Sequence, residues 1–217
     1  MSKAILRFEK LKSLSAVSSF ERHGKDRSRL SNRSHPEREV LNREYIPLIY
    51  ENKTMVERWR ECVGDATIRS NAVYAIEAVL AFSPESEAFI RQNRDAWMKA
   101  NARWLSSTFE GSRNIISLRV DEDEKTLHAH ALIVPMSDGK LNCKHFLNGK
   151  RCLSELQTSY ASAMRYFGLE RGTCWMDHPE ELTRRHEHQK KYWYEKERED
   201  IAWVKANYGD SFVNFDR

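Results

Sequence analysis

The sequence lacks the features that mark a membrane protein, a secreted protein or a small zinc module. No apolar run approaches the ~18–20 residues that a transmembrane helix needs, and residues 1–12 carry too many charges for a signal peptide. The four cysteines form no Cys-x-x-Cys pair, so neither a zinc knuckle nor a disulfide framework is indicated. We therefore expect a soluble cytoplasmic protein.

The composition is that of a folded chain with a basic N-terminal part. Of the 217 residues, 40% are hydrophobic and 11% aromatic, which suffices for a sizeable core and for one domain, with or without an appendage. The 36 lysines and arginines exceed the 32 acidic residues by four, and residues 1–60 hold 14 of these cations against 8 carboxylates. Such a distribution points to a localised anionic partner, most commonly nucleic acid, and the alternative is an accidental unevenness of surface charge.

The hydrophobic pattern predicts an α+β fold, in which a central antiparallel sheet carries helices packed on it. We expect strands over 4–10, 71–82, 114–120 and 128–135, and helices over 47–63, 83–109, 153–167 and 179–207. The strands over 114–120 and 128–135 flank a short acidic turn that suits an antiparallel hairpin. Residues 13–43 are rich in Ser, Arg and Asn, and we expect them to form a long functional loop.

Two histidines in the last of these strands are candidate metal ligands. His128 and His130 are two residues apart, so in a strand both side chains point to the same face. The acidic turn over 121–124 would offer an oxygen as a third ligand, and such a site keeps open positions for a phosphate oxygen. The alternative for His128 and His130 is that both are half-buried structural residues.

The basic N-terminal segment contains two candidate nucleophiles, His23 and Tyr45. Each can attack phosphorus and later leave, so that a covalent phospho-enzyme bond is made and resolved. The arginines and the lysine around them suit contacts with phosphates. For a single histidine in a loop, the alternative is an ordinary exposed imidazole.

Several segments, in consistent order, resemble the Mob/Pre (MobV-type) plasmid mobilisation relaxases, a branch of the HUH single-strand endonucleases. That family's third motif reads His-x-Asp-Glu-x-x-Pro-His-x-His before a strand that ends in Val-Pro, and it is similar to residues 121–135 here. Its first motif is similar to the stretch from His23 to Arg27, and its Asn-x-Glu motif to residues 42–44. The opening strand over 6–12 and the segments at 138–141 and 167–172 also match.

This resemblance implies a palm-like HUH domain over residues 1–175, followed by a charged helical extension over 176–217. It implies a metal-dependent relaxase that nicks single-stranded or hairpin DNA at a plasmid transfer origin, together with contacts to other mobilisation or coupling proteins. His23 would form the 5′-phosphoryl bond, with Tyr45 as the reserve nucleophile, and Glu124 would orient or deprotonate His23. The ligands of a Mn²⁺ or Mg²⁺ ion would be Asp121, His128 and His130. The candidate DNA-binding residues are Arg7, Lys25, Arg27, Arg33, Asn42, Arg43 and Arg69.

The sequence departs from the family pattern in three respects: two residues of the third motif, the spacing before His23, and the coiled-coil region. Asp121 replaces the first metal-binding histidine, and Leu127 replaces the proline before the histidine pair. Because aspartate is a competent ligand for Mn²⁺ or Mg²⁺, we expect a site that is richer in oxygen. The spacing from Phe20 to His23 is also one residue longer than in the family, and the long coiled-coil region of many members is absent from these 217 residues, as in a minimal member or an excised catalytic domain.

Two other classes of function stay open on the sequence. One is a rolling-circle replication initiator or a transposase of the HUH type, which shares the chemistry and differs in biological role. The other is a non-catalytic nucleic-acid-binding module in which aspartate at position 121 has abolished the metal site.

Overall fold

The computed structural model describes residues 2–25, 35–45 and 48–174. The chain divides into two units, residues 1–172 and 173–217, and all described helices and strands belong to the first. The helix predicted over 179–207 lies outside the described residues, and the boundary predicted at residue 175 stays a prediction. Within the described part of the chain, every helix is too short or too polar to cross a bilayer.

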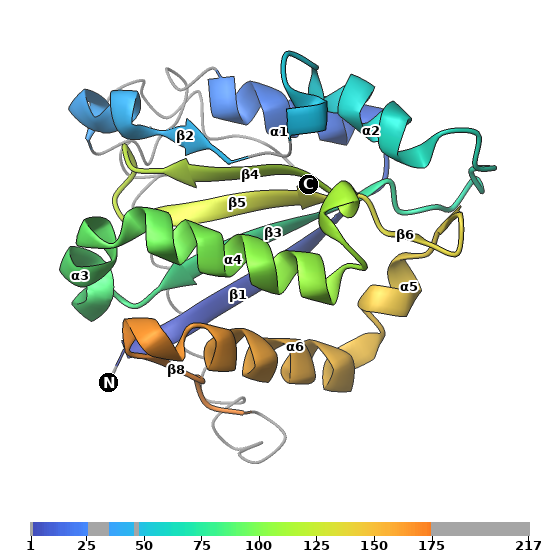
Figure 1. Cartoon of the computed structure of the whole chain (residues 1–217). Coiled ribbons are helices and arrows are strands. Elements are labelled where there is room, and N and C mark those ends of the chain that lie inside the picture. The colour runs from blue at the N-terminus through green and yellow to red at the C-terminus, as the bar shows by residue number, and fades with distance from the viewer. Residues whose placement is uncertain (1, 26–34, 46–47, 175–217) are drawn as a thin grey trace, which may run out of the picture. The chain divides into compact units, whose positions relative to one another are not determined.

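A six-stranded sheet forms the centre of the first unit (Figure 1), with the strand order β2-β4-β5-β3-β1-β8. Its strands are β1 (Ser2–Leu11), β2 (Arg43–Glu44), β3 (Ala75–Phe82), β4 (Ile115–Asp121), β5 (His128–Ile133) and β8 (Leu169–Glu170). Neighbouring strands are antiparallel except for β1 and β8, which are parallel. A separate hairpin joins β6 (Met136–Ser137) to β7 (Lys140–Leu141). The α+β class and the predicted hairpin of β4 and β5 are confirmed.

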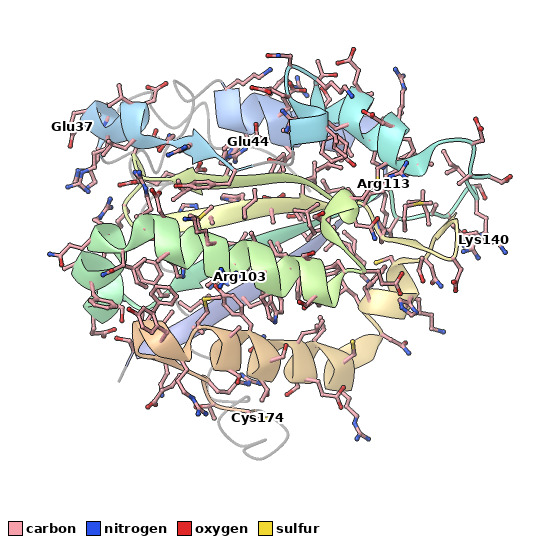
Figure 2. All side chains as sticks on the ribbon, viewed as in Figure 1. Glu37, Glu44, Arg103, Arg113, Lys140 and Cys174 are labelled. Carbon is pink, nitrogen blue, oxygen red and sulfur yellow. The ribbon has the colours of Figure 1, made fainter. Side chains whose placement is uncertain are left out.

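Helices cover both faces of the sheet (Figure 1). The face in front of the sheet in that view carries α4 (Arg94–Thr108) and α6 (Gly149–Ala163), and the other carries α1 (Leu14–Lys25) and α2 (Met55–Val63). The exposed side of α4 points away from the sheet, as Arg103 shows in Figure 2. The shorter helices are α3 (Glu87–Gln92), α5 (Cys143–Phe146) and the 3-10 turns η2 (Pro36–Leu41), η3 (Leu48–Tyr50), η4 (Pro84–Ser86), η5 (Ser112–Asn114) and η6 (Arg165–Phe167).

Two apolar clusters, one on each face, fix the direction in which each strand residue points. On β5, Ala129, Ala131 and Ile133 belong to the cluster under α4 and α6, whereas Leu132 belongs to the cluster under α1 and α2. Because side chains alternate along a strand, both histidines of β5 point to the face that carries α1 and α2.

The edge strand β2 is held by an ion pair that reaches across this second face. Glu44, labelled in Figure 2, accepts hydrogen bonds from Arg58 of α2 (2.7 Å) and from the hydroxyl of Ser117 on β4 (2.7 Å). Arg58 also donates to the carbonyl oxygen of Ile116 (3.0 Å), so its buried guanidinium is well satisfied. These bonds join α2, β2 and β4 at the edge of the sheet.

The prediction of a loop over 13–43 is wrong, because α1 and η2 lie within it. Ser13 accepts a hydrogen bond from the backbone of Ala16 at the start of α1, and Leu14, Val17 and Phe20 pack at intervals of three residues against the second apolar cluster. The serines between them are weak helix formers, so the pattern resembled a loop, and tertiary packing overrides that propensity.

The other predicted elements are present with different ends. The helix predicted over 47–63 is split at Asn52, whose φ is +60°, and α2 begins only after a capping box between Thr54 and Glu57. The helix predicted over 83–109 is broken at Asn93 into α3 and α4. The helix predicted over 153–167 starts earlier, at Gly149, and gives way to η6 before Phe167.

Candidate functional site

The two histidines of β5 lie side by side on the face of the sheet that carries α1. The ring centroids of His128 and His130 are 4.9 Å apart, and both side chains are mostly buried, with 13% and 11% of their surface exposed. Burial and the nearby charge of His130 lower the pKa of His128. A lowered pKa keeps that imidazole neutral at pH 7, which is the form that binds a metal ion.

Each histidine is oriented by a hydrogen bond at its Nδ1 atom. Nδ1 of His128 lies 2.8 Å from the carbonyl oxygen of Thr126, and Nδ1 of His130 lies 2.7 Å from a carboxylate oxygen of Glu77 on β3. Because both partners can only accept, we assign the ring proton to Nδ1 in each case, which leaves the lone pair on Nε2. This is the arrangement of metal-binding histidines with a fixed tautomer.

The acidic turn between β4 and β5 is buried, whereas such turns are usually solvated. Asp121 and Asp123 have no exposed surface, and Glu122 and Glu124 are 4% and 3% exposed. Four consecutive buried carboxylates are unfavourable unless cations or hydrogen-bond donors compensate them. Their burial therefore indicates that the turn is organised around positive charge.

Several side chains supply part of that compensation. Arg91 and Arg94 donate to the two carboxylate oxygens of Glu122, at 2.6 and 2.7 Å. The amide of Asn42 donates to Asp123 (2.8 Å), and its oxygen accepts the backbone N–H of Glu122 (2.6 Å). Asp121 and Glu124 are the two members of the turn that lie next to the histidines.

Helix α1 brings His23 to the same place, although His23 precedes the histidines of β5 by about a hundred residues in the sequence. Nε2 of His23 lies 3.9 Å from one carboxylate oxygen of Glu124, and Nε2 of His128 lies 3.7 Å from the other. The rings of His23 and His130 are 5.9 Å apart, and 40% of the His23 side chain is exposed. Glu124 thus lies between the histidine of α1 and a histidine of β5.

The donor atoms of these residues fall into two sets, each close enough together to bind a divalent cation, and His128 and His130 are not in the same set. Two overlapping groups have ligand atoms within 4.8 Å of one another: one contains His23, Asp121 and His130, and the other contains Asp121, Glu124 and His128. Asp121 is common to both groups, and one of its oxygens lies 3.8 Å from Nε2 of His130. Imidazole nitrogens together with carboxylate oxygens fit Mn²⁺ or Mg²⁺. The residues present therefore fit such an ion.

The candidate DNA-binding residues are distributed unevenly around this cluster. Arg7 is exposed on β1 and, through the register Arg7–Val79–His130, lies two strands from His130 on the same face, at about 10 Å. Lys25 ends α1 and pairs with Glu21, and Arg43 is exposed with its guanidinium 5.1 Å from the ring centroid of Tyr45.

The four remaining candidates differ from these three. Both polar atoms of the Asn42 side chain bond the acidic turn, so this residue holds the site together from within. Arg69 donates to the carbonyl oxygen of Leu141 in the β6–β7 hairpin. Arg27 and Arg33 lie outside the described residues.

Tyr45 lies apart from the histidine cluster. Its backbone pairs with Leu118, and its side chain packs against the apolar cluster under α4, on the opposite face of the sheet from His130. Its hydroxyl donates to Asp95 (2.6 Å), and burial together with this bond raises the pKa of Tyr45. A phenol with a raised pKa is a weaker nucleophile at neutral pH.

Sequence reasoning missed Glu77 and Arg119, which contact the ligands from neighbouring strands. Glu77 holds His130, and Arg119 donates from Nε to Asp121 (2.9 Å). Each is a charged residue inside an otherwise apolar strand segment, 75–82 or 115–120. A lone charge in a buried strand was therefore the signal that could have identified them.

Comparison with known proteins gives consistent matches. The sequence model of a family described as Mob_Pre, "Plasmid recombination enzyme", matches residues 1–192. A "65 kDa protein" of Zymomonas mobilis is 33% identical over 175 residues, which cover 78% of this chain and 30% of that protein. A "Plasmid recombination enzyme" of a Bacillus species is 29% identical over 186 residues, 79% of this chain and 43% of that protein. The chain thus spans less than half the length of these relatives.

Solved structures share the fold. The MobM relaxase domain bound to plasmid oriT DNA, in a Mn-bound crystal structure, superposes with a TM-score of 0.68 and 22% identity, covering 79% of this chain and 90% of that one. A second structure of the same domain, bound to a longer oriT oligonucleotide, gives a TM-score of 0.62 with 20% identity, again over 79% of this chain and 91% of that one.

Proposed function

Because the chain belongs to the Mob_Pre family of plasmid recombination enzymes, we propose that it is a relaxase domain that nicks one DNA strand at a transfer origin and stays joined to the 5′ phosphate. The observation that carries the proposal is the meeting of His23 with the histidines and carboxylates of the β4–β5 hairpin. A nucleophile beside a divalent-cation site is what phosphodiester transfer requires. The reaction on plasmid DNA would take place in the cytoplasm, where plasmids reside.

Asp121, His128 and His130 would hold the divalent cation, Mn²⁺ or Mg²⁺, with Glu124 at its edge. When bound, the cation would polarise the scissile phosphate and neutralise part of the charge that develops on it. The fixed Nδ1 bonds of the two histidines keep their Nε2 lone pairs directed to the site. Aspartate at position 121 therefore supports a working site, which speaks against the alternative of a module without metal.

His23 would attack the phosphorus atom with a ring nitrogen. The bond from phosphorus to O3′ breaks, and the departing oxygen keeps the electron pair and takes up a proton, which leaves a 3′-hydroxyl. Glu124 is close enough to His23 to orient its ring and to accept its proton. The covalent phosphoryl bond preserves the free energy of the phosphodiester, so the ends can be rejoined without ATP.

The exposed half of the sheet beside the cluster suits the DNA strand. On β1 and β3, the side chains that point to the α1 face are exposed or half-buried, except for the buried pair Leu11 and Ala75, in contrast to the fully buried opposite face of β3. Arg7 lies on this surface, and Lys25 lies on the other side of the cluster at the end of α1, whereas the guanidinium of Arg43 lies by Tyr45 on the opposite face. Arg7 and Lys25 in these places would contact backbone phosphates and set the register of the strand.

Incubation of the full chain with labelled single-stranded oligonucleotides that tile the DNA next to its gene tests the proposal. With Mn²⁺ present, we expect a labelled adduct that survives denaturation, and its loss when EDTA is added. The His23→Ala variant should form no adduct, whereas Tyr45→Phe should form it at a rate close to the wild type.

Two outcomes of the same experiment would contradict the proposal. Cleavage of the oligonucleotide without an adduct would indicate a hydrolytic nuclease. An adduct that persists in His23→Ala and disappears in Tyr45→Phe would assign the nucleophile to Tyr45. Mn²⁺ titration of each variant tests whether the cation site is intact. An unchanged Mn²⁺ affinity shows that the substitution acts on the chemical step.

A further inference from the structure

We infer that Arg119 is a positioning residue, which locks the metal ligand Asp121 to the helical turn that carries the nucleophile His23. The inference rests on the proposed function, because it assigns the coupling between the two halves of that site. Arg119 lies on β4 directly across from His130, and only 8% of its surface is exposed. It is the buried cation next to the ligands, and sequence motifs give it no role.

The first half of this coupling is the bond to Asp121. Nε of Arg119 donates to Oδ1 of Asp121 at 2.9 Å, and Oδ2 is the oxygen that lies 3.8 Å from Nε2 of His130. A carboxylate held by one oxygen has a fixed plane, so the other oxygen is presented in one direction. Arg119 thereby sets which Asp121 oxygen faces the cation.

The second half is the contact with α1. Nη1 of Arg119 lies 3.4 Å from the carbonyl oxygen of Phe20, and the guanidinium carbon lies 4.7 Å from the centroid of the Phe20 ring. The same ring packs edge-on against His130, with centroids 6.3 Å apart. The turn of α1 that ends in His23 therefore contacts both Arg119 and the metal-binding strand.

Gly24 makes this close approach possible. A Cβ atom at this position would come within 2.3 Å of Nη1 of Arg119 and 3.0 Å of its guanidinium carbon. Gly24 lies within helix α1, so glycine is needed here because it has no side chain and not because it can adopt a left-handed backbone. The residue after the nucleophile is thus in direct van der Waals contact with Arg119.

The guanidinium is not arranged for stability alone. Nη2 of Arg119 is buried and makes no hydrogen bond within the described part of the chain. An unsatisfied buried donor is unfavourable. The geometry therefore favours the bonds of Nε and Nη1 at the expense of the third nitrogen, which is expected of a residue retained for positioning.

The experiment compares Arg119→Met and Arg119→Lys with the full wild-type chain. We expect Arg119→Met to lower the rate of adduct formation at saturating DNA and Mn²⁺ by roughly 10- to 100-fold, because the ring of His23 is no longer held in line with the phosphorus atom. The affinity for Mn²⁺ without DNA, measured from the EPR signal of the free ion, should stay within about threefold, because removing the positive charge of Arg119 beside the cation offsets the looser orientation of Asp121. Arg119→Lys should remain as slow, because one ammonium cannot bond Asp121 and α1 at once.

A thermal double-mutant cycle gives a readout that is independent of activity. Gly24→Ala should lower the Tm in the wild-type background and change it by less than about 2 °C in the Arg119→Met background, where the clash is absent. Equal Tm losses in both backgrounds, a full rate in Arg119→Lys, or a Mn²⁺ affinity reduced more than tenfold in Arg119→Met would each overturn the inference. If the wild type forms no adduct, the proposed function fails, and the Tm cycle still decides on Arg119.

Discussion

The carboxylate of Glu77 shows how much a single buried charge contributes to the candidate metal site. It is the only charged residue of β3, and it accepts the Nδ1–H of His130 at 2.7 Å. This bond fixes the ring and its tautomer, and the negative charge makes Nε2 a stronger donor to a cation. Glu9 lies directly across from Glu77 on β1, is exposed, and contacts no histidine of the site.

Substitution of Glu77 should weaken metal binding. We expect Glu77→Gln to reduce the affinity for Mn²⁺ by about tenfold, because the hydrogen bond can persist while the charge is lost, and Glu77→Ala to reduce it by up to about 100-fold. Isothermal titration with Mn²⁺ measures both. Glu9→Gln is the matched control and should leave the affinity unchanged. Equal losses of Mn²⁺ affinity at the two positions would show that any negative charge on this sheet surface has the same effect and that the bond from Glu77 to His130 adds nothing.

Among the elements, the acidic turn between β4 and β5 depends on a segment distant in sequence. Asn42 bonds the backbone of Glu122 and the side chain of Asp123, and the backbone N–H of His35 donates to the carbonyl oxygen of Asp123 (2.9 Å). The segment around η2 and β2 therefore acts as a clasp over the turn. Preorganised ligands bind a cation more tightly than ligands that must first be ordered.

This geometry gives Asn42 a testable role different from DNA contact. We expect Asn42→Ala to loosen the turn and to lower the Mn²⁺ affinity by roughly 10-fold or more, with a matching loss in the rate of adduct formation. The affinity for a single-stranded oligonucleotide in the presence of EDTA should stay the same. The reverse outcome, weaker DNA binding with unchanged Mn²⁺ affinity, would restore Asn42 to the DNA-binding residues.

The sequence predicted the parts of the site that are local, and not the parts that depend on tertiary packing. The pairing of His128 with His130 follows from strand periodicity, and the hairpin follows from the turn between two apolar runs. Helix α1 was missed because its serines hide a packing face of only four apolar residues. Its location beside the hairpin depends on an aromatic contact between Phe20 and His130, which no local pattern encodes.

The burial of the acidic turn could not be predicted for a similar reason. Carboxylates are usually solvated, and here they are buried because Asn42, Arg91, Arg94 and Arg119 bond them, the first three from parts of the chain distant from the turn. Each of these partners is an ordinary polar residue in its own sequence context. Only the assembled fold shows that they converge on four consecutive carboxylates.

For the whole molecule, the site belongs to the face of the sheet that carries α1 and to one stretch of the chain. The buried members of both clusters lie between Leu6 and Leu169, and the candidate ligands lie between His23 and His130. The first unit ends at residue 172, whereas the family match continues to residue 192. Residues 173–192 thus belong to the family pattern and lie outside the first unit.

Truncation tests whether the folded domain ends near residue 172 or continues to residue 192. We expect a chain of residues 1–175 to unfold cooperatively, with a Tm within a few degrees of the full chain, because it keeps both apolar clusters. Its affinity for Mn²⁺ should be within about twofold of the full chain, since all candidate ligands and their partners are retained. A chain of residues 1–192 is the matched comparison. If 1–192 melts cooperatively and 1–175 does not, residues 176–192 are part of the folded domain and the boundary predicted at residue 175 is wrong.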